Sequence, residues 1–297
     1  MKTALFIFLT YTLIQNNVYG STTLGDSNDN TSIYLWGTNS VSSNIKDKSI
    51  KLTYLNSESD DKYSWGLALK GKAADGSSLL FEGSEATPET TVSIPIGKHW
   101  IFSTNPKVGE PGIISDDWLF FEAKYKSGEH QLFDKTLAFD KQLYKEKLNS
   151  KILSLSYNAI IDGVFLTGVS IEYGKENNYE DLSKISVKTT TTIGSEGNDI
   201  RISESSIDAR EGKYVEFNQR KINMDFMYVP GMLRNRIGFD LFARHTSSSF
   251  KGSNTNYGIG IFVLDEKGPT RILAGVTYMH DDEENENLIG LVAGYNF

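Results

Sequence analysis

The sequence predicts an all-β fold, a transmembrane antiparallel up-and-down β-barrel of about twelve strands and at most about fourteen. Three observations predict it. The C-terminal half alternates apolar and polar residues in segments of about ten, separated by turn chemistry. Apolar faces recur in successive segments, and the chain ends on an aromatic strand, Leu288 to Phe297.

The last strand sorts its side chains into two faces, because successive residues of a strand point to opposite sides. One face suits lipid and carries Ile289, Leu291, Ala293, Tyr295 and Phe297. The other is small or polar and carries Gly290, Val292, Gly294 and Asn296.

The same alternation predicts the strands before it. Their outward sets are Ile222, Met224, Phe226 and Tyr228; Ile237, Phe239, Leu241 and Ala243; Tyr257, Ile259, Ile261 and Val263; and Ile272, Ala274, Val276 and Tyr278. Upstream, two hairpins are expected, Ser154–Ala159 with Phe165–Tyr173 around a turn at Ile161-Asp162-Gly163, and Trp118–Tyr125 with Gln131–Phe139 around a turn at Ser127-Gly128-Glu129. Strands are also expected near 63–72 and 90–101.

The connections predict an orientation. Short turns at Pro230-Gly231 and 265–269 are expected on the periplasmic side, and longer polar loops at 174–181, 247–255 and 281–287 on the outer side.

The first twenty residues read as a signal peptide, with Lys2, an apolar run from Ala4 to Ile14, and small residues before Ser21. The predicted domains are therefore the signal, 1–20, and the barrel, 21–297. The chain contains no cysteine, so a lipoprotein anchor is not expected. Its formal charge of −8 argues against a nucleic-acid partner.

The terminal strand resembles the recognition strand of Gram-negative outer-membrane proteins, through Phe297 and Tyr295 two residues before it. The resemblance implies a location in the cell outer membrane, contact with outer-membrane lipids and lipopolysaccharide, and recognition by the barrel assembly machinery. Tyr295 and Phe297 would then serve as the insertion signal.

The predicted inward faces carry opposite charges, Lys221, Asp225, Arg236, Asp240 and Arg244. Such charges form either a constriction that selects solutes or a salt-bridged plug that holds the barrel. Inward glycines at 258, 260, 275, 290 and 294 leave space and favour an open or ligand-holding interior. The function expected is a porin-like channel or binding barrel for small solutes, with no cofactor.

A second hypothesis comes from His245 and Ser247, which share an outward face. The pair is similar to the His-x-Ser of outer-membrane phospholipases and lipid A deacylases, but the third residue that orients the histidine is missing from the adjacent strand. Enzyme activity is less expected than a non-catalytic barrel. The sequence also fits a structural or adhesive barrel and a secreted soluble β protein. The four histidines lack the spacing of metal ligands.

Overall fold

The computed structural model describes residues 40–44, 49–56, 62–72, 89–103, 113–196, 199–233, 236–264, 272–282 and 286–296. No helix among them is long and apolar enough to cross a membrane. The elements in these ranges are the strands β1 (Ser40–Asn44), β2 (Ser49–Asn56), β3 (Tyr63–Lys72), β4 (Glu89–Ser103), β5 (Ile114–Phe133), β6 (Leu143–Ile161), β7 (Phe165–Asn177), β8 (Ser183–Glu196), β9 (Asp199–Glu211), β10 (Glu216–Tyr228), β11 (Ile237–Ser248), β12 (Gly252–Leu264), β13 (Ile272–Asp281) and β14 (Glu286–Asn296), and the 3-10 helices η1 (Phe139–Lys141), η2 (Tyr179–Asp181) and η3 (Gly231–Leu233).

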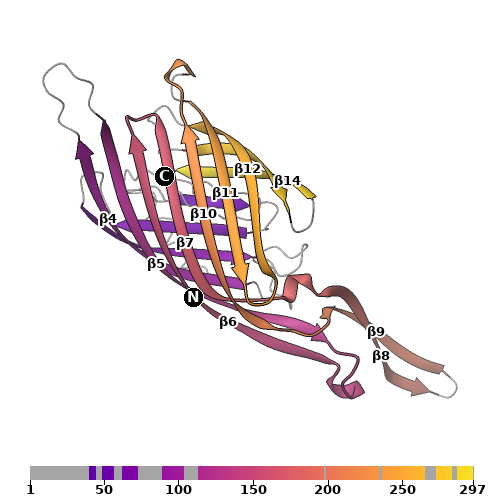
Figure 1. Ribbon diagram of the computed structural model, residues 1–297. Coiled ribbons are helices and arrows are strands. Elements are labelled where there is room, and N and C mark those ends of the chain that lie inside the picture. Colours follow the sequence, from indigo (N-terminus) through magenta and orange to yellow (C-terminus); the bar gives the residue numbers. More distant parts are fainter. Residues whose placement is uncertain are drawn as a thin grey trace, which may run out of the picture.

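Twelve of the described strands form a closed antiparallel ring. The order β4-β3-β2-β1-β14-β13-β12-β11-β10-β7-β6-β5 is completed by pairing of β4 with β5. The first and last described strands, β1 and β14, are also neighbours, with Val41 opposite Tyr295. Closure satisfies the backbone hydrogen bonds of every ring strand without leaving an edge. The predicted up-and-down barrel of about twelve strands is confirmed (Figure 1).

The predicted alternation is present in the ring. On β11 and β14 the outward Leu241 and Ile289 are 61% and 67% exposed, whereas the inward Phe262 and Met279 are 1% exposed. Other outward side chains form a belt of exposed apolar residues that runs through successive strands: Leu67, Ile94, Phe121, Leu155, Ile171, Phe226, Phe239, Ile259, Ile261 and Val276. The outer wall is therefore apolar and the inner wall is buried.

Both ends of the ring are defined by its turns. We call the end where β1 begins and β14 ends the termini end, and the opposite end the extension end. The turn between β6 and β7 lies at the termini end, and its Asp162 and Gly163 have φ of 51° and 68°. These left-handed values suit an Asp-Gly hairpin turn, so this predicted hairpin is confirmed. The connection that contains Pro230 and Gly231 lies at the same end.

One predicted connection is wrong and another is shorter than predicted. The chain does not turn at Ser127-Gly128-Glu129: β5 continues through these residues, which pair with Asn149, Leu148 and Lys147 of β6. The predicted polar loop 247–255 is mostly strand as well, because β11 reaches Ser248 and β12 starts at Gly252. In both places the backbone N–H and C=O groups of turn-forming residues are hydrogen-bonded to a neighbouring strand, which keeps the segment extended.

A β extension projects from the ring at the extension end. It comprises the C-terminal end of β5, the N-terminal end of β6 and the β8–β9 hairpin. Figure 1 shows the β8–β9 hairpin leaving the barrel at the lower right. β9 attaches to β5 through two parallel pairs, Leu132 with Arg210 and Phe133 with Glu211. The alternation pattern of the sequence did not predict this hairpin.

The extension has its own small core. Leu132 is fully buried, and the ring of His130 stacks on that of Tyr179 with centroids 3.9 Å apart. The guanidinium of Arg210 lies 5.1 Å from the Tyr179 ring centre and donates to the Leu182 carbonyl at 2.8 Å. These contacts fix the base of the β8–β9 hairpin on the long β5–β6 hairpin.

Candidate functional site: the barrel interior

An apolar layer fills the barrel at the termini end. Trp118 and Phe120 of β5, both at most 2% exposed, pack with side chains contributed by strands around the ring. The other members of the apolar layer are Leu55, Leu166, Met227, Val229, Phe262 and Leu264, with Ile160 packed against them. A water-filled lumen would leave inward side chains accessible. The burial of these residues therefore closes this end of the interior.

The inward glycines do not leave open space. A β-carbon built at Gly258 would lie 2.1 Å from Phe242 Cζ, and one at Gly260 would lie 2.5 Å from Phe262 Cε2. The Phe262 ring also covers Gly275, and Gly290 is buried. For Gly258, Gly260 and Gly275 the expectation that inward glycines widen the lumen is wrong, because aromatic rings from neighbouring positions occupy the space that they provide. The surroundings of Gly294 lie outside the described part of the structure.

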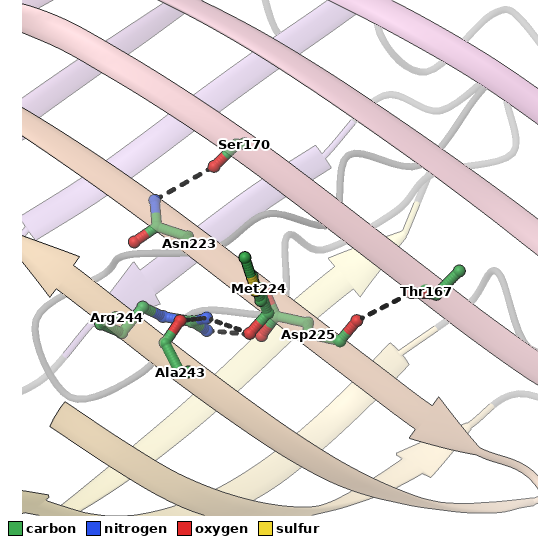
Figure 2. A network of polar contacts seen from close by, with 7 residues as sticks. All are labelled: Thr167, Ser170, Asn223, Met224, Asp225, Ala243 and Arg244. Carbon is green, nitrogen blue, oxygen red and sulfur yellow. Dashed lines mark hydrogen bonds and ion pairs between the residues drawn. The ribbon is translucent and has the colours of Figure 1, made fainter. Parts of the chain in front are cut away.

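Next to the apolar layer lies a buried ion pair (Figure 2). Arg244 Nη2 on β11 lies 2.5 Å from Asp225 Oδ1 on β10, and the two side chains are 5% and 0% exposed. Arg244 Nη1 also donates to the carbonyls of Met224 and Ala243, at 2.7 and 3.1 Å. The guanidinium is thus held by one carboxylate and two carbonyl oxygens, away from water.

Of the three other predicted lumen residues, one lies beside this ion pair and two lie away from it. Asp240 is inward and buried, and its Oδ1 has no hydrogen-bond partner among the described residues. Arg236 precedes β11 at the termini end and is exposed. Lys221 is inward on β10 but lies four residues from Asp225 towards the extension end, opposite Glu172 of β7. Asp240 is close enough to interact electrostatically with Asp225 and Arg244. The structure therefore brings these three residues together and separates Arg236 and Lys221 from them.

A second charged group lies nearer the extension end and was not predicted from the sequence. Lys124 of β5 pairs with Glu172 of β7 and lies 3.5 Å from Glu122, which also accepts a 2.5 Å hydrogen bond from Ser93. Lys126 pairs with Glu176 at 3.1 Å. The available signal was the period-two run Glu122, Lys124, Lys126, but the turn expected at 127–129 placed this segment beside a strand end.

The two charged groups differ in their access to water. The Lys124, Lys126, Glu172 and Glu176 side chains are 15–19% exposed, in contrast to the Arg244–Asp225 pair. The interior is therefore divided along its axis into an apolar layer, a buried ion pair, and a charged region towards the extension end that is partly exposed except at Glu122. We call the partly exposed region, with Lys124, Lys126, Glu172 and Glu176, the cup.

His245 and Ser247 both occupy the outward face of β11, as the alternation predicts. His245 Nδ1 forms a 2.8 Å hydrogen bond with Thr255 Oγ1 on β12. Within the described ranges no hydrogen bond joins His245 to Ser247. A threonine hydroxyl orients the ring without supplying the negative charge or amide dipole that stabilises an imidazolium in hydrolases.

Tyr295 lies in β14 and its backbone pairs with Val41, whereas Phe297 and the predicted signal, 1–20, lie outside the described residues. Among the residues in the described ranges, no three His, Cys, Asp or Glu side chains are grouped as a metal site.

No protein-family model matches this chain, and no curated protein matches it. Among solved structures a porin is similar, with 9% sequence identity and a TM-score of 0.33, over 87% of this chain and 97% of that chain.

Proposed function

We propose that this chain is an outer-membrane β-barrel of a Gram-negative bacterium, exported by its first twenty residues. The apolar belt on the outer wall supports this proposal, because a soluble barrel has no reason to expose aliphatic side chains on successive strands. Aromatic side chains near the edges of the belt, among them Tyr125, Tyr173, Tyr257 and Tyr278, suit a membrane interface.

Within that membrane, we propose that the barrel binds a small charged solute in the cup and conducts only when the apolar layer moves. The observation that carries this proposal is the axial division of the interior. A partly exposed charged region faces the extension end, and a buried apolar layer with Trp118 and Phe262 fills the termini end. Apolar constrictions are known to gate pores by excluding water.

Planar-bilayer recording tests the gate. The wild-type barrel is expected to show little steady conductance, and Trp118→Ala combined with Phe262→Ala is expected to open discrete channels. Ile261→Ala, on the outward face beside Phe262, is the matched control and should behave as wild type. Steady wild-type conductance that the double variant leaves unchanged would refute the gate.

Membrane location is tested separately by fractionation and by heat-modifiable migration on denaturing gels. Recovery in the outer-membrane fraction with a heat-dependent shift is expected. A protein that stays in the soluble fraction and shows no shift would be a secreted β protein, which the sequence also fits.

A second candidate function is recognition by the β extension. The observation that favours it is the projection of β8 and β9 beyond the ring, where most described side chains of the hairpin are exposed. In the predicted orientation this end faces outward from the cell, as an adhesive surface requires.

A further inference from the structure

A carboxylate lies on the outward side of the barrel wall, near the termini end. Asp117 shares its face of β5 with Phe121 and Tyr125, which are both 45% exposed on the outer wall. Asp117 itself is only 4% exposed, and its Oδ1 accepts a hydrogen bond from the hydroxyl of Tyr157, an outward residue of β6. An ionisable group on a lipid-facing surface is costly, so its presence there indicates a partner.

Two aromatic residues and an alanine surround this carboxylate. Strand pairing places Trp100 of β4 on one side of Asp117 and Ala159 of β6 on the other. The ring centroids of Trp100 and Tyr157 are 6.3 Å apart, and the two residues are 38% and 41% exposed. Because Asp117 is on the outward face and is almost fully buried, these two rings cover it, while their own outer sides face the membrane.

The second oxygen of the carboxylate lacks a donor. Asp117 Oδ2 is buried and has no hydrogen-bond partner among the described residues. A buried carboxylate oxygen without a donor costs free energy, because it has lost the water that would otherwise bind it. The neighbouring Asp116 is on the opposite face of β5 and pairs with His99. That pair therefore does not supply the donor.

A lysine occupies the same face, one row further into the apolar belt. Lys98 is exposed on β4 and lies opposite Leu119, the next outward residue of β5 after Asp117. Within the described ranges no ion pair joins Lys98 to Asp117. The long stem of a lysine can lie along the wall and bring its ammonium to the membrane interface. An unsatisfied acceptor beneath two aromatic rings and a cation therefore lie in adjacent rows of the outer wall.

We propose that Lys98, Trp100, Asp117 and Tyr157 bind a phospholipid headgroup that carries a primary ammonium and a phosphate, as in phosphatidylethanolamine. The ammonium donates to Asp117 Oδ2 and lies against the aromatic rings, once rotation of the Trp100 side chain gives access to that oxygen. Lys98 supplies the counter-charge of the phosphate. This assignment rests on the proposed membrane location. A quaternary ammonium has no N–H to donate, so phosphatidylcholine fits this headgroup site less well.

Native mass spectrometry of the full-length protein folded in detergent measures this binding. Titration with phosphatidylethanolamine and with phosphatidylcholine gives a dissociation constant for the first bound molecule of each lipid. Wild type should bind phosphatidylethanolamine about tenfold more tightly, the gain expected for one charge-assisted hydrogen bond. Asp117→Asn should abolish that preference. Asp162→Asn, in the β6–β7 turn at the same end of the barrel, is the matched control and should keep it.

A second variant separates the ammonium contact from the phosphate contact. Lys98→Gln should weaken the binding of both lipids by a similar factor, because both carry a phosphate, and should leave the ratio of their dissociation constants unchanged. Equal dissociation constants in wild type, or an unchanged ratio in Asp117→Asn, would overturn the headgroup site, provided that heat-modifiable migration shows each variant folded. Neither result affects the membrane location, which fractionation tests by itself; recovery in the soluble fraction would overturn that location whatever the lipid titration gives.

Discussion

Phe262 lies directly over Gly275, its cross-strand neighbour: a β-carbon at Gly275 would stand 2.2 Å from Phe262 Cδ1. The Phe262 ring on β12 thus packs against the backbone of Gly275 on β13, and the same ring also covers Gly260. This contact joins two neighbouring strands and provides part of the apolar layer. Aromatic rings placed over glycines are a recurrent way to stabilise β-barrels.

The Phe262–Gly275 contact predicts that Gly275→Val destabilises the barrel by about 1–3 kcal/mol, because the ring must leave its position. The measurement is the temperature at which migration on a denaturing gel shifts. Ala274→Val, on the outward face of the same strand, should have little effect. If Gly275→Val costs as much stability in a Phe262→Ala background as in wild type, the clash is not the cause.

Removal of the buried Arg244 guanidinium should lower the free energy of unfolding. Arg244→Met leaves Asp225 buried without its guanidinium partner, and a loss of about 3–5 kcal/mol in unfolding free energy is expected. Asp225→Asn in addition should recover part of that loss. Lys251→Met breaks the exposed 2.7 Å pair with Asp181 and should cost at most about 1 kcal/mol. Urea titration in detergent compares the three variants, and equal losses would contradict the buried ion pair.

The outer wall makes a prediction about lipid. Leu241→Arg places a charge in the middle of the apolar belt and should cost about 2–4 kcal/mol in a bilayer. The expected readout is reduced recovery of folded barrel from vesicles. Ser186→Arg, exposed on the β8–β9 hairpin, is the control. Equal recovery of both variants would mean that the belt does not face lipid.

The extension should be separable from the barrel. Replacement of 183–211 by a short Gly-Ser linker removes the parallel pairing to β5 but no ring pairing. We therefore expect the heat-dependent gel shift to persist while any adhesion to surfaces or cells is lost. Adhesion unchanged by the deletion would eliminate the extension as a recognition surface.

The loop between β5 and β6 should respond to acid. The Asp134 carboxylate accepts hydrogen bonds from Thr136 Oγ1 at 2.6 Å and from the Thr136 amide at 2.8 Å. These bonds lower the pKa of Asp134 below its ordinary value of 3.8. Their stabilisation is complete above that value and is lost as pH falls through the lowered pKa. Exchange of the Thr136 amide, corrected for its intrinsic rate, should accelerate in acid, and Asp134→Asn should abolish the pH dependence.

Strand faces were predictable where alternation is strong. From Ile222 to Leu291 the apolar residues recur with a period of two, so the outward and inward sides of β10 to β14 follow from covalent geometry. The inward direction of both Asp225 and Arg244 follows from the same period. The long β5 strand was not predictable, because Gly128 is typical of a turn and only its pairing with Leu148 keeps the segment extended.

The sequence by itself determined the β-barrel class, the two faces of the C-terminal strands and the presence of opposite charges inside, because all three depend on period-two alternation. Only the tertiary structure decided that the inward glycines are covered, since Phe242 and Phe262 reach them from neighbouring strands. It also decided that Lys124 and Glu172 meet across β6. Contacts of this kind depend on which strands become neighbours and in which register, which a single sequence does not specify.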